Sequence, residues 1–92
     1  MVGVIGWDLQ IFDAHSLKEK RGVVKRVKHR LRDRLNLSVA ETGHHDLWQR
    51  AEITACVVAT DRRQAESVLD RADRLVESEL AGRIIDSYRT FY

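Results

Sequence analysis

Hydrophobic and polar positions alternate along the first twelve residues. The apolar side of this alternation consists of Ile5, Trp7, Leu9 and Ile11. The other side carries Gly6, Asp8 and Gln10. A period of two residues is typical of a strand with one buried face, because successive side chains of a strand point to opposite faces of the sheet. The pattern therefore predicts a first strand over residues 2–12.

The hydrophobic period lengthens after a turn at residues 13–15. Apolar residues then recur at steps of three, four and seven, which places them on one face of a helix about five turns long. They are Leu17, Val24, Val27, Leu31 and Leu35. Ser16 and Glu19 have the spacing of a capping box, in which each side chain accepts a hydrogen bond from a free amide at a helix start. We expect this helix to begin at Ser16 and to end near Asn36.

The second half of the chain repeats the succession of strand and helix. Residues 37–42 predict a short strand, and residues 51–60 predict a third strand rich in small side chains. Asp61 and Gln64 repeat the spacing of a capping box, so we expect a second amphipathic helix to begin there. Gly82 lies just past the end of that helix, where a left-handed backbone costs glycine little.

Residues 83–92 predict a final strand. We expect one face of it to carry Ile84, Tyr88 and Tyr92, and the other to carry Ile85 and Phe91. The resulting order of elements predicts an α+β fold of ferredoxin-like βαββαβ topology, in which a four-stranded antiparallel sheet is covered by two helices on one face. Right-handed crossovers place the first and third strands in the centre. Residues 1–92 are expected to form a single domain around one core.

The composition is that of a globular protein, with 43% hydrophobic and 33% charged residues. No apolar run approaches the roughly 20 residues that cross a bilayer, and no leader-like segment precedes the first strand, so we expect a soluble cytoplasmic protein without membrane contact. The single cysteine, Cys56, cannot form an internal disulfide. Its place in a predicted strand favours a small buried hydrophobic residue over a reactive thiol.

Charge is distributed unevenly along the chain. The net charge is +2, yet residues 18–34 contain nine Lys or Arg against two acids. Helical spacing gathers part of this charge into a row beside the apolar stripe, formed by Lys18, Arg21, Lys25, Lys28 and Arg32 together with His29. Such a row can bind a phosphate backbone through counterion release, without reading sequence. The alternative is a solvated helix face that only keeps the protein soluble.

Lys20 differs from the row because its direction falls inside the apolar stripe. Either its stem lies along the edge of the core while the ammonium group reaches solvent, or the ammonium is held there to meet an anion. We favour the first alternative. Lys20 is a secondary candidate for phosphate contact, after the residues of the row. Arg50, which lies before the third strand, is another.

Trp48, Gln49 and Arg50 bring an indole, an amide and a guanidinium close together before the third strand. Exposed, Trp48 is a candidate for stacking on a base while Arg50 contacts a phosphate. Buried, Trp48 closes the bottom of the core while Asp46 pairs with Arg50. We favour this structural role.

The sequence contains no motif for catalysis or metal binding. His44 and His45 are neighbours without a Cys or His at structural-zinc spacing, which favours a polar loop. No nucleophile with a placed base, paired-carboxylate motif or glycine-rich phosphate loop is present. We therefore expect no enzyme activity, no cofactor and no small-molecule substrate.

The open face of the predicted sheet offers a different kind of surface. It presents the small, mildly apolar residues Val4, Gly6, Cys56 and Val58. Small domains often cover such a face by dimerising. A homodimer, or a docked protein partner, is therefore the alternative to nucleic-acid binding.

Three segments carry a resemblance to a known family. They are residues 16–21 (SLKEKR), 36–41 (NLSVAE) and 46–52 (DLWQRAE). In this order they resemble the YlxP-like bacterial family, domain of unknown function 503, over nearly the whole chain. The resemblance implies a ferredoxin-like fold and no established activity, cofactor or catalytic residue. Genes of that family often lie beside those for translation initiation factor two and ribosome-binding factor A, which implies ribosomal RNA or a ribosome-assembly factor as partner.

Overall fold

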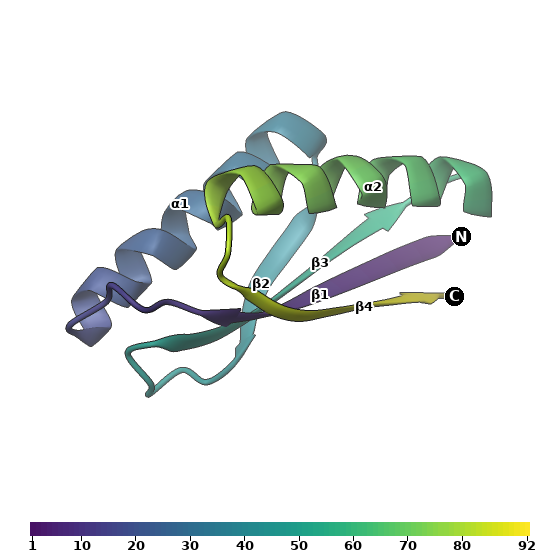
Figure 1. Cartoon of the computed structure of the whole chain (residues 1–92). Coiled ribbons are helices and arrows are strands. Elements are labelled where there is room, and N and C mark those ends of the chain that lie inside the picture. Colours follow the sequence, from purple (N-terminus) through teal and green to yellow (C-terminus); the bar gives the residue numbers. More distant parts are fainter.

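The computed structural model describes all residues 1–92 and contains four strands and two helices (Figure 1). In chain order these elements are β1 (Val2–Gln10), α1 (Leu17–Leu35), β2 (Ser38–Gly43), β3 (Arg50–Val58), α2 (Arg62–Glu79) and β4 (Ile84–Phe91). Each predicted element is present, with ends that differ by no more than two residues from those expected. The βαββαβ order predicted from the sequence is confirmed.

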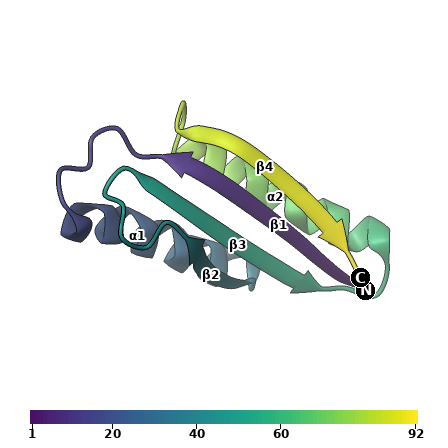
Figure 2. The ribbon, with the colours of Figure 1, turned by 90° about the horizontal axis from the view of Figure 1, so that it is seen from below.

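The strands form one antiparallel sheet in the order β2-β3-β1-β4. The central positions of β1 and β3 are those predicted. Both helices lie on the same face, with α1 on the side of β2 and β3 and α2 on the side of β1 and β4 (Figure 2). The two chain ends lie side by side, and the Val2 amide donates to the Tyr92 carbonyl at 2.9 Å.

Both helices begin with the predicted caps. The Ser16 hydroxyl accepts a hydrogen bond from the Glu19 amide at 3.1 Å, and the Asp61 carboxylate accepts one from the Gln64 amide at 2.8 Å. At the other end of α1, Asn36 has a left-handed backbone with a φ of 54°. Beyond α2, Gly82 has a φ of 76°. The caps therefore account for where the helices start and stop.

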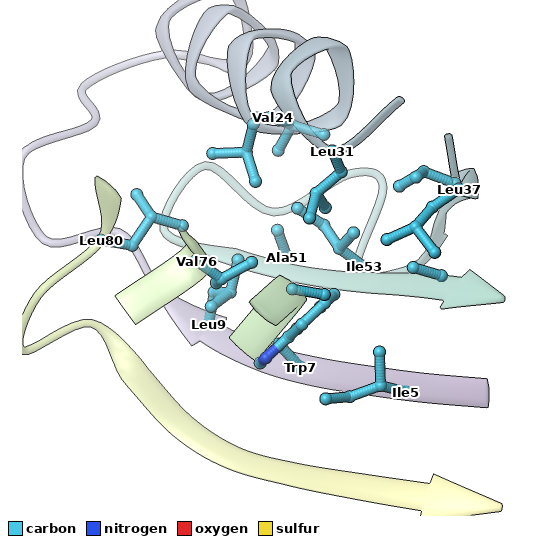
Figure 3. Packing of buried hydrophobic residues seen from close by; sticks show 14 of the residues in the cluster. Ile5, Trp7, Leu9, Val24, Leu31, Leu37, Ala51, Ile53, Val76 and Leu80 are labelled. Atoms are coloured by element: carbon cyan, nitrogen blue, oxygen red, sulfur yellow. The ribbon is translucent and has the colours of Figure 1, made fainter. Parts of the chain in front are cut away.

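The core lies between the sheet and the two helices (Figure 3). Its largest fully buried side chains include Trp7, Leu9, Leu31, Ile53 and Leu69. The indole Nε1 of Trp7 donates to the Asp73 carboxylate of α2 at 2.9 Å, so the one polar atom of this large side chain is satisfied. No helix is both long enough and apolar enough to span a membrane.

A register shift in β4 changes one predicted face. Asp8 pairs with Asp86 and the next residue, Leu9, pairs with Ile84, so Ile85 is an extra residue in the strand. Because an extra residue reverses the alternation of side chains, Ile84 packs against the core while Tyr88 lies on the open face. The prediction that Ile84 shares a face with Tyr88 is therefore wrong.

The open face of the sheet is partly covered by Tyr88. Its ring lies across Gly6, where an added Cβ would stand 2.2 Å from the ring carbon Cζ. Glycine at this position leaves room for the aromatic ring of the neighbouring strand. Cys56 lies on the same open face, as expected from its outward position in the third strand, and is half-buried rather than buried.

Candidate nucleic-acid interface

The predicted cationic row is present on α1 and is available to solvent. Lys18, Arg21, Lys25 and Arg32 are exposed, and Lys28 is half-buried. None of the five forms an ion pair within the molecule. From first to last the row spans about 21 Å at the helical rise of about 1.5 Å per residue. It is a continuous strip of positive charge without an internal counter-charge.

The row lies on the side of α1 that faces the β2 edge of the sheet. The Arg32 guanidinium donates to the Val39 carbonyl of β2 at 2.7 Å. Arg32 therefore also supports the contact between α1 and β2, whereas Lys18, Arg21 and Lys25 have no such task.

Lys20 is completely buried, with 0% of its surface exposed. Its ammonium Nζ donates to the Glu41 carboxylate at 2.9 Å, to the His44 carbonyl at 2.9 Å and to the His45 carbonyl at 3.1 Å. The favoured alternative, an ammonium that reaches solvent, is wrong because all three N–H groups are used inside the protein. Lys20 is accordingly removed from the candidate phosphate contacts.

Glu41 is the partner that sequence reasoning missed. It follows Leu37 and Val39 at steps of two along the inward side of β2, and both of these residues are buried. A carboxylate in an inward position and a lysine in an apolar helical stripe are each costly to bury alone. A small domain that contains both an inward carboxylate and a lysine in an apolar stripe is expected to pair them, and this was the sequence signal for the Lys20–Glu41 pair.

Arg50 pairs with Asp8 rather than with Asp46. Its Nη2 donates to the two carboxylate oxygens of Asp8 at 3.0 and 2.9 Å. Asp8 comes from the adjacent central strand, and that strand pairing brings it within reach of Arg50. The predicted pair is wrong, and the charge of Arg50 is largely offset by Asp8.

Trp48 lies on the surface, with 54% of the residue exposed. The buried residues near this segment are instead Leu9 and Ile11, and the Ile11 amide donates to the Gln49 carbonyl. Trp48 borders an open hollow of about 450 Å³, lined by Gln10, Asp46, Leu47, Trp48, Gln49 and Arg50. The structural role that we favoured for Trp48 is therefore wrong.

The segment that carries Trp48 is bound to two other parts of the chain. The Gln49 side chain donates to the Phe12 and Ala14 carbonyls, each at 3.2 Å, and the Ile11 amide donates to the Gln49 carbonyl at 2.7 Å. Lys20 holds the start of the same segment through the His44 carbonyl. The connection between β2 and β3 is thus attached both to the β1–α1 connection and to α1.

No group of three or more His, Cys, Asp or Glu side chains is arranged to hold a metal ion. The His45 ring Nε2 lies 2.9 Å from the Glu41 carbonyl, and the His44 ring lies 3.6 Å from the Asp8 carboxylate. These histidines are engaged with neighbouring protein groups.

Away from the row, a backbone hydrogen bond and the nearby Arg83 guanidinium lower the pKa of Asp13.

The topology and the packing of both helices on one face define a ferredoxin-like α+β protein. The chain is similar to a de novo designed protein with ferredoxin fold, at 18% identity and a TM-score of 0.56, over 98% of this chain and 82% of the other. It is similar to the designed protein Foldit4, at 13% identity and a TM-score of 0.60, over 100% and 99% of the two chains. Protein YJCS, from structural genomics, aligns at 8% identity with a TM-score of 0.56 over the same shares.

Sequence comparison then places the chain within a family. The model of the family described as "Protein of unknown function (DUF503)" matches residues 2–89, so the chain belongs to that family. It is 38% identical over 78 residues to the "Uncharacterized protein YlxP" of Bacillus subtilis (strain 168), covering 85% of each chain. The resemblance noted from the three sequence segments is confirmed.

Proposed function

We propose that this protein is a non-catalytic RNA- or ribosome-associated binding module that contacts phosphates through α1. The contacting residues would be Lys18, Arg21, Lys25, Lys28 and Arg32. The observation that carries the proposal is that these cations, four of them exposed and Lys28 half-buried, form one row without any ion pair. Charge that is not neutralised within the molecule is free to act on a ligand.

The chemistry of the row suits a phosphate backbone. Lysine and arginine side chains that neutralise phosphates release condensed counterions, and this release drives binding that is independent of sequence. The contribution of such cations is electrostatic and involves no bond making, so no catalytic step is proposed. The gene neighbours implied by the family resemblance support ribosomal RNA, or a ribosome-assembly factor bound to it, as the partner.

Binding to total ribosomal RNA and to purified ribosomal subunits, measured across a salt series, tests this function. Five phosphate contacts predict that the logarithm of the association constant falls with the logarithm of salt concentration with a slope of about −3.5 to −4.5. Binding that does not depend on salt, or no binding even at low salt, would contradict the proposal.

The open sheet face supports a second candidate, a homodimer or a protein-interaction domain. Val58 and Tyr92 are 80% and 76% exposed at the end of the sheet where the two termini lie. Clustered apolar surface of this kind is a common site of self-association. Sedimentation velocity at micromolar concentration should then show a dimer that Val58→Asp dissociates. A strict monomer removes the homodimer.

A further inference from the structure

We infer that the hollow beside Trp48 receives an unpaired base, so that the RNA bound by α1 is single-stranded at this end of the protein. The inference rests on the proposed function and names the class of RNA that the site prefers. Its basis is an exposed indole on an anchored segment, close to the start of the cationic row.

The backbone that presents Trp48 is anchored on both sides of it. Lys20 holds the carbonyls of His44 and His45, and the neighbouring residue Gln49 is tied to the β1–α1 connection by backbone and side-chain hydrogen bonds. A stacking platform that is already ordered loses little conformational entropy when a ligand binds. The indole therefore has the support that base stacking requires.

The hollow and the row meet at one end of the molecule. Lys20, whose ammonium holds the β2–β3 connection, lies in the first turn of α1, between Lys18 and Arg21. Both views show this connection lying at the N-terminal half of α1 (Figures 1 and 2). A strand that follows the row toward Lys18 thus arrives where Trp48 is exposed. A flexible single strand can bend around this end, whereas the bases of a duplex remain stacked on one another.

The groups around the hollow suit a base better than a phosphate. Asp46 is exposed and forms no ion pair, so its carboxylate repels an anion but can accept a hydrogen bond from an N–H group of a base, such as the N3–H of uracil. The Arg50 guanidinium is already paired with Asp8. Leu47, 49% exposed, adds apolar surface beside the indole. A neutral aromatic ring is the ligand that these groups accept together.

The probes are an oligouridylate of about 12 nucleotides, within the usual range of single-strand site sizes, and an RNA duplex of the same length. Stacking should quench the fluorescence of Trp48, while the buried Trp7 provides an internal reference. Trp48→Ala should weaken binding of the single strand about 10-fold and binding of the duplex less than about 2-fold. Trp48→Phe should retain most of the affinity, because phenylalanine also stacks.

Three outcomes would overturn the inference. If Trp48→Ala leaves single-strand binding unchanged, or weakens both RNAs equally, the hollow does not hold a base, although α1 can still bind phosphates. If Trp48 emission does not change at saturating oligouridylate, the indole does not stack on a base. If the wild-type protein binds neither RNA at low salt, the proposed function fails as well, so the two failures are distinguishable.

Discussion

The two helices cover the same face of one sheet, yet they differ in the sign of their charged residues and in how many of them are paired within the protein. α1 carries nine Lys or Arg and two acids over 19 residues, whereas α2 carries four Arg and five acids over 18 residues. Four of the five acids of α2 have partners: Glu66 pairs with Arg62, Asp70 with Arg89, Asp73 accepts from the Trp7 indole, and Glu79 pairs with Arg30. The negative charge of α2 is largely used within the fold.

α1 uses its charge differently. Of its nine cations, Lys20 and Arg30 form ion pairs, and Arg32 donates to a backbone carbonyl. The remaining cations form no ion pair. Charge that stabilises the molecule is thus distinct from charge that is free to bind. Lys20 and Asp73 belong to the first kind, and Arg21 and Lys25 belong to the second.

The largest expected effect on stability comes from Lys20. Lys20→Met leaves the Glu41 carboxylate, whose side chain is only 14% exposed, without its counter-ion and frees the β2–β3 connection. Breaking a buried ion pair by removing one partner should lower the free energy of unfolding by about 3 kcal/mol. Urea denaturation measures the change.

Lys25→Met is the matched control, because Lys25 is exposed on the same helix and forms no ion pair. It should change the free energy of unfolding by less than about 0.5 kcal/mol. Equal effects of the two substitutions would mean that α1 contains no distinction between structural and free charge.

A smaller effect is expected from Asp73 of α2. Asp73→Ala leaves the Nε1 donor of the buried Trp7 without an acceptor, which should cost about 2 kcal/mol. Glu77→Ala on the same helix is the control, since Glu77 is exposed and unpaired. Urea denaturation followed by tryptophan emission measures the free energy of unfolding of both variants. An Asp73→Ala variant as stable as the wild type would contradict the structural role assigned to the acids of α2.

The smallest effect on stability is expected from the ion pair between Asp13, in the β1–α1 connection, and Arg83, in the α2–β4 connection. Asp13 accepts from Arg83 at 3.3 Å, and its pKa is lowered below 3.8, first by a backbone hydrogen bond and then by Arg83. A lowered pKa in the folded state means that the stabilisation is complete above about pH 4 and is lost as the pH falls through the folded-state pKa.

Asp13→Asn should therefore lower the stability slightly at pH 7, change it little at pH 2, and so reduce the loss of stability between about pH 4 and pH 2. Thermal unfolding across this range measures the effect. An unchanged pH profile in the variant would show that Asp13 does not contribute to acid sensitivity.

The sequence predicted the fold well because local signals agreed with one another. Alternation identified β1 and β3, and the side chains of Ser16 and Asp61 marked both helix starts. The face of Ile84 could not be predicted, because it depends on a one-residue shift against β1 that only the pairing of the strands determines.

The candidate site was predicted less completely. The cationic row follows directly from helical spacing, but the partners of Lys20 and Arg50 come from other strands. A charged side chain can choose among several acids at similar sequence distance, and tertiary packing decides between them. Trp48 is exposed for a related reason: Trp7 and its neighbours already fill the core, and no local pattern reports that competition.

The most direct test of the central claim compares charge reversal on the two helices. Arg21→Glu with Lys25→Glu changes α1, and Arg71→Glu with Arg74→Glu changes α2 by the same charge at exposed, unpaired positions. At low salt the α1 pair should weaken binding to ribosomal RNA more than about 10-fold and the α2 pair less than about 3-fold. Both variants should keep the wild-type free energy of unfolding within about 0.5 kcal/mol. Equal losses, or no loss from the α1 pair, would contradict the assignment of the free charge of α1 to RNA.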